Sequence, residues 1–98
     1  MLFNPGRMVC TRGVKDRKCM DFGFFRFVDE SIARHLRGDW GDLCPEDGEM
    51  NDEVIAAEQR GELTDSLFSM YRYDDGTGIY IITEWNRSVT TVLFPEEY

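Results

Sequence analysis

The 98-residue sequence is poor in cysteine, proline and histidine, with three, three and one of them. No apolar run approaches the ~20 residues that cross a membrane. The first ten residues also lack the apolar core of a secretory signal. We therefore expect a cytosolic protein whose thiols stay reduced, without a disulfide framework. The length predicts a single domain, residues 1–98, with a thin margin of stability.

Basic side chains become scarce after residue 37. Residues 1–37 carry eight Lys or Arg against four Asp or Glu, whereas residues 38–98 carry three against fifteen, which together give a net charge of −8. Asp39 to Glu58 holds eight acids and no base. Such a segment repels phosphate backbones and attracts basic surfaces, including nucleic-acid grooves of other proteins. Alternatively, it is only a well-solvated face that keeps a small protein in solution.

The hydrophobic pattern predicts one strand and two helices in the first two thirds of the chain. Residues 6–14 alternate as a short strand, and the polar residues 15–18 read as a loop. A helix capped by Asp21 and stopped at Gly38 has its apolar stripe at Phe25, Val28, Ile32 and Leu36. A second helix begins at Pro45, carries a stripe of Met50, Val54 and Ala57, and ends at Gly61. Between the helices, Trp40 is expected to fill the core.

The last third of the chain is rich in β-branched and aromatic residues. Segments 67–73, 78–85 and 88–94 read as strands joined by turns at Asp74–Gly78 and Asn86–Arg87. The expected fold is α+β in the order β-α-α-β-β-β, with two helices packed on one face of a mainly antiparallel four-stranded sheet. Tyr73, Tyr80 and Trp85 are either a recognition surface or members of cross-strand pairs.

Every thiol and the only imidazole could form one metal site. Cys10, Cys19, His35 and Cys44 make up the Cys₃His set of a closed structural zinc shell. A zinc ion there would join the first strand, a loop, a helix and a turn, which would help a marginal domain. The spacings are wider than those of zinc knuckles, and in the alternative interpretation the thiols are unrelated and His35 is a core or helix-end histidine.

No catalytic residue is predicted, because the sequence contains no nucleophile elbow, no papain-type cysteine motif and no His-Glu-x-x-His motif. The predicted order of elements resembles that of small RNA-cleaving toxins from bacterial toxin–antitoxin pairs. Those enzymes need a basic surface, whereas residues 67–98 carry five acids and only two bases, Arg72 and Arg87. We therefore expect a protein that is not an enzyme and keep a toxin-like RNA-cleaving protein as an alternative.

Three segments resemble a family of small proteins carried by bacterial phages, prophages and plasmids: TRGV at 11–14, RHLRGDWGDLC at 34–44 and IITEWNRSVTTVLFPEEY at 81–98. In size, acidity and character the chain also resembles a zinc-containing anti-CRISPR protein. This resemblance implies a phage protein that evades host defence in the bacterial cytoplasm. It implies an inhibitor of a nuclease, namely the type II CRISPR effector.

An RNA-guided nuclease reads its target in a positively charged channel, so an acidic domain could occupy that surface and block loading of target DNA. The expected contact residues lie in the acidic segment: Asp42, Glu46, Asp47, Glu49, Asp52 and Glu53. Direct binding to nucleic acid or membrane is not expected. A DNA-mimic inhibitor of restriction enzymes is a second alternative.

Overall fold

The computed structural model describes residues 1–62 and 64–98. The chain runs through β1 (Arg7–Cys10), α1 (Arg12–Met20), α2 (Phe22–Leu36), α3 (Pro45–Gln59), β2 (Leu67–Arg72), β3 (Gly78–Thr83), β4 (Val89–Leu93) and a short 3-10 helix, η1 (Pro95–Glu97). The α+β class is confirmed. The order of elements is corrected to β-α-α-α-β-β-β, because there are three α-helices among the described residues instead of two.

The four strands form one sheet in the order β1-β4-β3-β2. The pairings of β2 with β3 and of β3 with β4 are antiparallel, as expected, but β1 pairs with β4 in parallel. The sheet is therefore mixed. A parallel pair requires a long crossover, and here α1, α2, α3, β2 and β3 all lie between the two partners in sequence.

Helix α1 is the element that the sequence did not predict. Its residues were assigned to the end of the first strand and to a polar loop. Only Val14 of this helix is buried, so nine largely polar residues carry no apolar stripe that would reveal a helix. The helix forms because Val14 joins the main core and α1 packs against α2.

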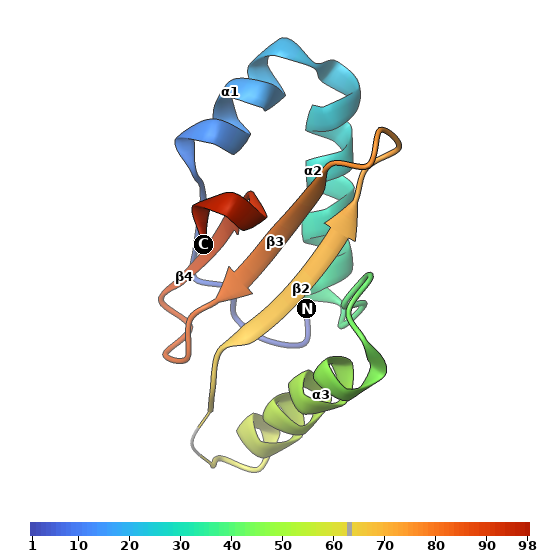
Figure 1. The fold of residues 1–98 in the computed structure, drawn as a ribbon. Coiled ribbons are helices and arrows are strands. Elements are labelled where there is room, and N and C mark those ends of the chain that lie inside the picture. The colour runs from blue at the N-terminus through green and yellow to red at the C-terminus, as the bar shows by residue number, and fades with distance from the viewer. Residues whose placement is uncertain (63) are drawn as a thin grey trace.

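The main core lies between α2 and one face of the sheet (Figure 1). Phe24 and Val28 of α2 contact Ile79, Ile81 and Val92 from the strands. The predicted stripe on α2 is confirmed at Val28, which is buried, and in part at Ile32 and Leu36, which are half-buried against the two cores. It is wrong at Phe25, which is 40% exposed, because Phe24 is the buried residue of the first turn. The ends of the helix are confirmed: the Asp21 carboxylate accepts a hydrogen bond from the Phe24 N–H, and Gly38 follows the helix with φ of +83°.

A second, smaller core joins α3 to the end of the sheet. It consists of Phe3, Trp40, Ile55 and Leu67. Trp40 is 7% exposed, which confirms its predicted place in the core. The molecule measures 42 × 26 × 23 Å, and α1 and α3 lie at opposite ends of it (Figure 1). No helix in the described part of the chain is long and apolar enough to cross a membrane.

The aromatic residues of the sheet segments fall into two groups. Tyr73 packs against Phe27 with ring centroids 5.0 Å apart, and Tyr80 packs against Phe68 at 4.7 Å. These two tyrosines are therefore packing residues. Trp85, in the turn between β3 and β4, is 59% exposed.

Candidate protein-binding surface

Helix α3 begins and ends where its local chemistry predicts. Pro45 is its first residue, and Glu46 and Asp47 lie in the first turn, where the helix dipole favours negative charge. Gly61 follows the helix with φ of +79°. The predicted apolar stripe holds only in part, because Val54 packs half-buried against the second core. The buried residues are Asn51 and Ile55, whereas Met50 is 66% exposed.

Three hydrogen bonds from two successive residues hold α3 to the rest of the protein. The Asn51 amide donates to the Phe68 carbonyl oxygen (2.6 Å) and accepts from the Phe68 N–H (3.3 Å). The Trp40 indole N–H donates to the Asp52 carboxylate (2.9 Å). Because these contacts lie on successive residues, α3 is fixed in rotation as well as in position.

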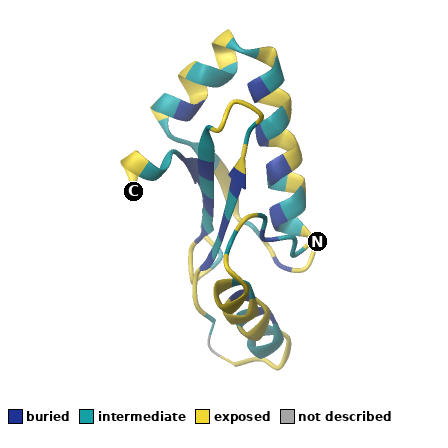
Figure 2. Ribbon diagram, turned by 45° about the vertical axis from the view of Figure 1, so that its right-hand side comes forward, coloured by how far each residue is buried: buried dark blue, intermediate teal, exposed yellow. Residues whose placement is uncertain are grey.

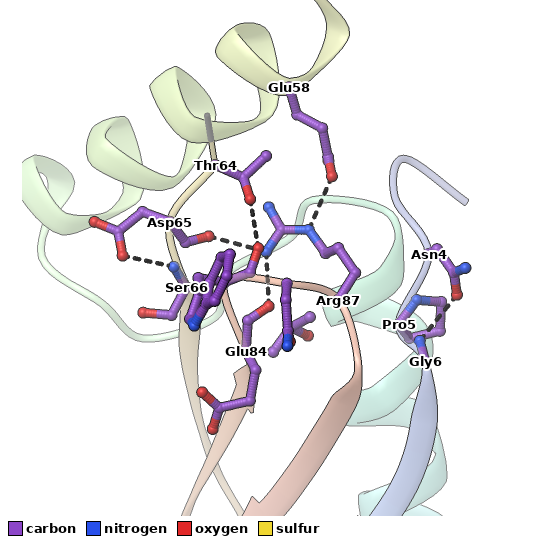
Figure 3. Close-up of polar contacts among 12 residues, drawn as sticks. Asn4, Pro5, Gly6, Glu58, Thr64, Asp65, Ser66, Glu84 and Arg87 are labelled. Carbon is purple, nitrogen blue, oxygen red and sulfur yellow. Dashed lines mark hydrogen bonds and ion pairs between the residues drawn. The ribbon is translucent and has the colours of Figure 1, made fainter. Parts of the chain in front are cut away.

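Arg87 secures the other end of α3 (Figure 3). Its Nε lies 3.0 Å from the Glu58 carboxylate, and its Nη1 donates to the carbonyl oxygens of Asp65 and Glu84. The Arg87 side chain is 8% exposed, so the ion pair is largely shielded from water. One guanidinium thus connects α3, the segment before β2 and the turn after β3.

All six predicted contact residues are exposed. Asp42 lies in the turn before α3, and the other five lie on α3 itself, which is exposed along much of its length (Figure 2). Asp52 accepts the hydrogen bond from Trp40. Within the described residues the remaining acids form no ion pair, and they are Asp42, Glu46, Asp47, Glu49 and Glu53.

The other two acids between residues 39 and 58 form ion pairs within the protein. Asp39 pairs with Arg34 at 2.7 Å, and Glu58 pairs with Arg87. Five uncompensated carboxylates therefore remain on one rigid helix and the turn before it. Such an arrangement raises the local concentration of basic partners and repels phosphates.

The opposite end of the molecule carries exposed charges of both signs. Arg12, Lys15 and Arg26 are exposed on α1 and α2, and so are Asp16, Asp29 and Glu30. The excess of one sign is therefore a feature of the α3 surface and not of α1 and α2.

His35 is fully buried, and both of its ring nitrogens are hydrogen-bonded. Nδ1 lies 2.6 Å from the Ser69 hydroxyl, and Nε2 lies 2.9 Å from the Thr83 hydroxyl. The Thr83 hydroxyl contacts Thr90 at 2.7 Å, and Thr90 donates to the Pro5 carbonyl oxygen.

This chain of bonds assigns the tautomer of His35. Since the Thr90 proton goes to Pro5, Thr83 must donate to Thr90 and accept from the Nε2–H of a neutral imidazole. Burial, followed by the charge of Arg87, lowers the pKa of His35 to about 4. The only imidazole of the chain is therefore a core residue.

The three thiols lie on separate elements. Cys10 is half-buried at the end of β1, Cys19 is exposed near the end of α1, and Cys44 is exposed just before α3. The Asp47 N–H favours the Cys44 thiolate, but the carboxylates of Asp47 and Glu46 outweigh it and raise the pKa of this thiol.

The structure thus does not bring the four predicted zinc ligands together. In residues 1–62 and 64–98, no group of three or more His, Cys, Asp or Glu side chains could hold a metal ion. Zinc binding remains a prediction from the sequence that this arrangement does not support.

Comparison of the chain with models of protein families, with curated proteins and with solved structures finds no match. The proposed function therefore rests on the surface of α3 and the turn before it. Sequence reasoning found its acids but missed the exposed Met50 among them, because a methionine at helical spacing reads as core.

Proposed function

We propose that this protein is a phage-encoded anti-CRISPR inhibitor. It binds a type II CRISPR RNA-guided nuclease of the host through the acidic surface of α3 and blocks loading of target DNA. It would act in the host bacterial cytoplasm, not as an enzyme, and without contacting nucleic acid or membrane itself.

The observation that carries this proposal is the set of five exposed carboxylates without ion pairs on α3 and the turn before it. Helix α3 is held by Asn51, Asp52 and Glu58, so binding need not order it and loses little conformational entropy. The nuclease holds its nucleic acids in a positively charged channel. Acids facing that channel would accelerate association and exclude the negatively charged target.

The direct test is loading of labelled target DNA onto guide-bearing nuclease with increasing amounts of the protein. We expect loading to fall, and the inhibition to weaken as salt is raised. The triple variant Glu46→Gln, Glu49→Gln, Glu53→Gln should lose most of the inhibition. Unchanged loading at excess wild-type protein would refute the proposal.

A matched control removes three charges elsewhere. Asp16, Asp29 and Glu30 are exposed on α1 and α2 and form no ion pair within the described residues. The variant Asp16→Asn, Asp29→Asn, Glu30→Gln should inhibit like the wild type. Equal loss in both triple variants would mean that net charge matters and the α3 surface does not. A restriction enzyme in place of the guided nuclease tests the DNA-mimic alternative with the same variants.

A further inference from the structure

Beside the exposed acids, α3 forms an apolar groove with the start of β2. The groove has a volume of about 270 Å³. Its apolar lining comes from Leu43 in the loop before α3, Met50 and Val54 on α3, and Phe68 on β2. Asp47 and Asp65 line it as well. The groove thus combines apolar and acidic residues, and it shares Asp47 with the exposed acids of the α3 surface.

Met50 has no part in holding the fold together. The buried positions of α3 are Asn51 and Ile55, and Met50 is 66% exposed in the middle of the helix. Met50 also lines a second, wider hollow on the outer face of α3, together with Glu46, Glu49 and Glu53. An exposed methionine between two hollows suits a binding surface, since its side chain is flexible and polarizable.

We propose that this groove takes an apolar anchor side chain from a basic segment of a partner protein. This inference rests on the proposed function and gives the chemistry of its partner. The groove is smaller than the ~300 Å³ at which small-molecule pockets begin, so it suits one or two side chains of a peptide. Asp65 and the five free carboxylates, Asp47 among them, favour Lys or Arg beside that anchor.

The combination corresponds to recognition of an amphipathic basic helix, whose apolar face enters a groove while its charged face meets acids. This mode of binding differs from mimicry of DNA. A DNA mimic imitates the negative charges of a phosphate backbone, which has no groove for an apolar side chain of the partner. Affinity should therefore depend on the anchor as well as on the carboxylates, which also accelerate association.

The test uses the full-length protein and two synthetic peptides of equal length and charge. One is an amphipathic helix of Lys and Leu, and the other has Ser in place of every Leu. We expect the Lys/Leu peptide to bind at least tenfold more tightly. The variant Met50→Ser should remove most of that preference, and its melting temperature should match that of the wild type because the side chain is exposed.

Met20 provides the matched control. It is 88% exposed at the end of α1, so Met20→Ser makes the same chemical change at the opposite end of the molecule and should leave peptide binding unchanged. Equal affinity for the two peptides, or equal loss in both methionine variants, would overturn the groove. Failure of both peptides to bind would overturn it as well.

The two proposals fail in different ways. If the Lys/Leu peptide binds through Met50 but nuclease loading is unaffected, the groove stands and the nuclease is not its partner. If loading is blocked by wild type and by Met50→Ser alike, the acidic surface stands and the groove is overturned.

Discussion

The side chain of Asn51 pairs with the backbone of Phe68 as a neighbouring strand would. Its amide donates to the Phe68 carbonyl oxygen and accepts from the Phe68 N–H. Two residues further along β2, the Met70 N–H donates to the Trp40 carbonyl oxygen and the Met70 carbonyl oxygen accepts from the Asp42 N–H. The outer edge of β2 is thus closed within the molecule, which protects it from pairing with another chain.

Replacing Asn51 should therefore destabilise the protein strongly. Asn51→Leu keeps the branched shape of the side chain but leaves the Phe68 N–H and carbonyl without partners. Each such group costs about 1–3 kcal/mol when buried, so we expect a loss of about 3 kcal/mol and a fall of the melting temperature by more than 10 °C. Thermal denaturation followed by circular dichroism measures this.

Gln59→Leu is the control. This substitution also replaces a side-chain amide by leucine, but Gln59 is exposed at the end of α3. It should melt within about 2 °C of the wild type. An equally small change in Asn51→Leu would mean that the pair with Phe68 contributes little.

The Arg87–Glu58 pair should be worth more than an exposed pair. Arg87→Met leaves Glu58 and two carbonyl groups without their donor. Breaking a shielded pair costs about 3 kcal/mol, whereas a pair in water contributes less than about 1 kcal/mol. Urea denaturation should show this difference against Arg60→Met, because the Arg60 and Glu62 side chains are 56% and 55% exposed.

Equal losses in the two arginine variants would contradict this prediction. If only Arg87→Met loses much stability, this variant should also inhibit loading less than the wild type. The reason is that Arg87 fixes the end of the helix that carries the acids.

Local chemistry predicted the boundaries of α2 and α3 correctly from the sequence. Asp21, Pro45 and Gly61 act through contacts within one turn of their own position, so a single sequence contains the information. The three later strands were predictable for a similar reason. Their alternation and turn residues are properties of short segments.

The features that the sequence did not predict depend on contacts between residues far apart in the chain. Helix α1 exists through one buried residue, Val14, and the parallel pairing of β1 with β4 joins residues some 80 positions apart. Asn51 is polar, so its burial follows only from the position of Phe68. The sequence leaves His35 either a metal ligand or a core residue, because it cannot show that Ser69 and Thr83 bond both ring nitrogens.

The zinc prediction has a direct test. In the described structure the His35 nitrogens are both used and two of the thiols are exposed. We therefore expect metal analysis of protein purified without a metal column to find far less than one zinc per chain, and a chelator to leave the melting temperature unchanged. Cys44→Ser should also melt like the wild type, because the thiol is exposed.

A stoichiometric zinc ion, lost together with stability in Cys44→Ser, would instead support the metal site. Metal binding that is coupled to folding would appear as a drop in melting temperature on chelation.

The buried imidazole predicts how stability depends on pH. The pKa of His35 is about 4 in the folded protein and about 6.5 in an unfolded chain. Between these values the unfolded chain binds a proton that the folded protein does not, so acidification favours unfolding. We expect the free energy of unfolding to fall by about 3 kcal/mol between pH 6.5 and pH 4 from this group, with no contribution from it above pH 7.

The variant His35→Gln isolates this contribution, because His35 is the only histidine and the carboxylates are common to both proteins. Urea denaturation at pH 7, 6, 5 and 4 should show that the difference in stability between wild type and variant shrinks with acidification. NMR of the imidazole protons gives an independent measure, and a titration with a midpoint near 6.5 in the folded protein would contradict burial of His35. A difference that stays constant with pH would mean that the imidazole titrates alike in the folded and unfolded states, which contradicts the prediction.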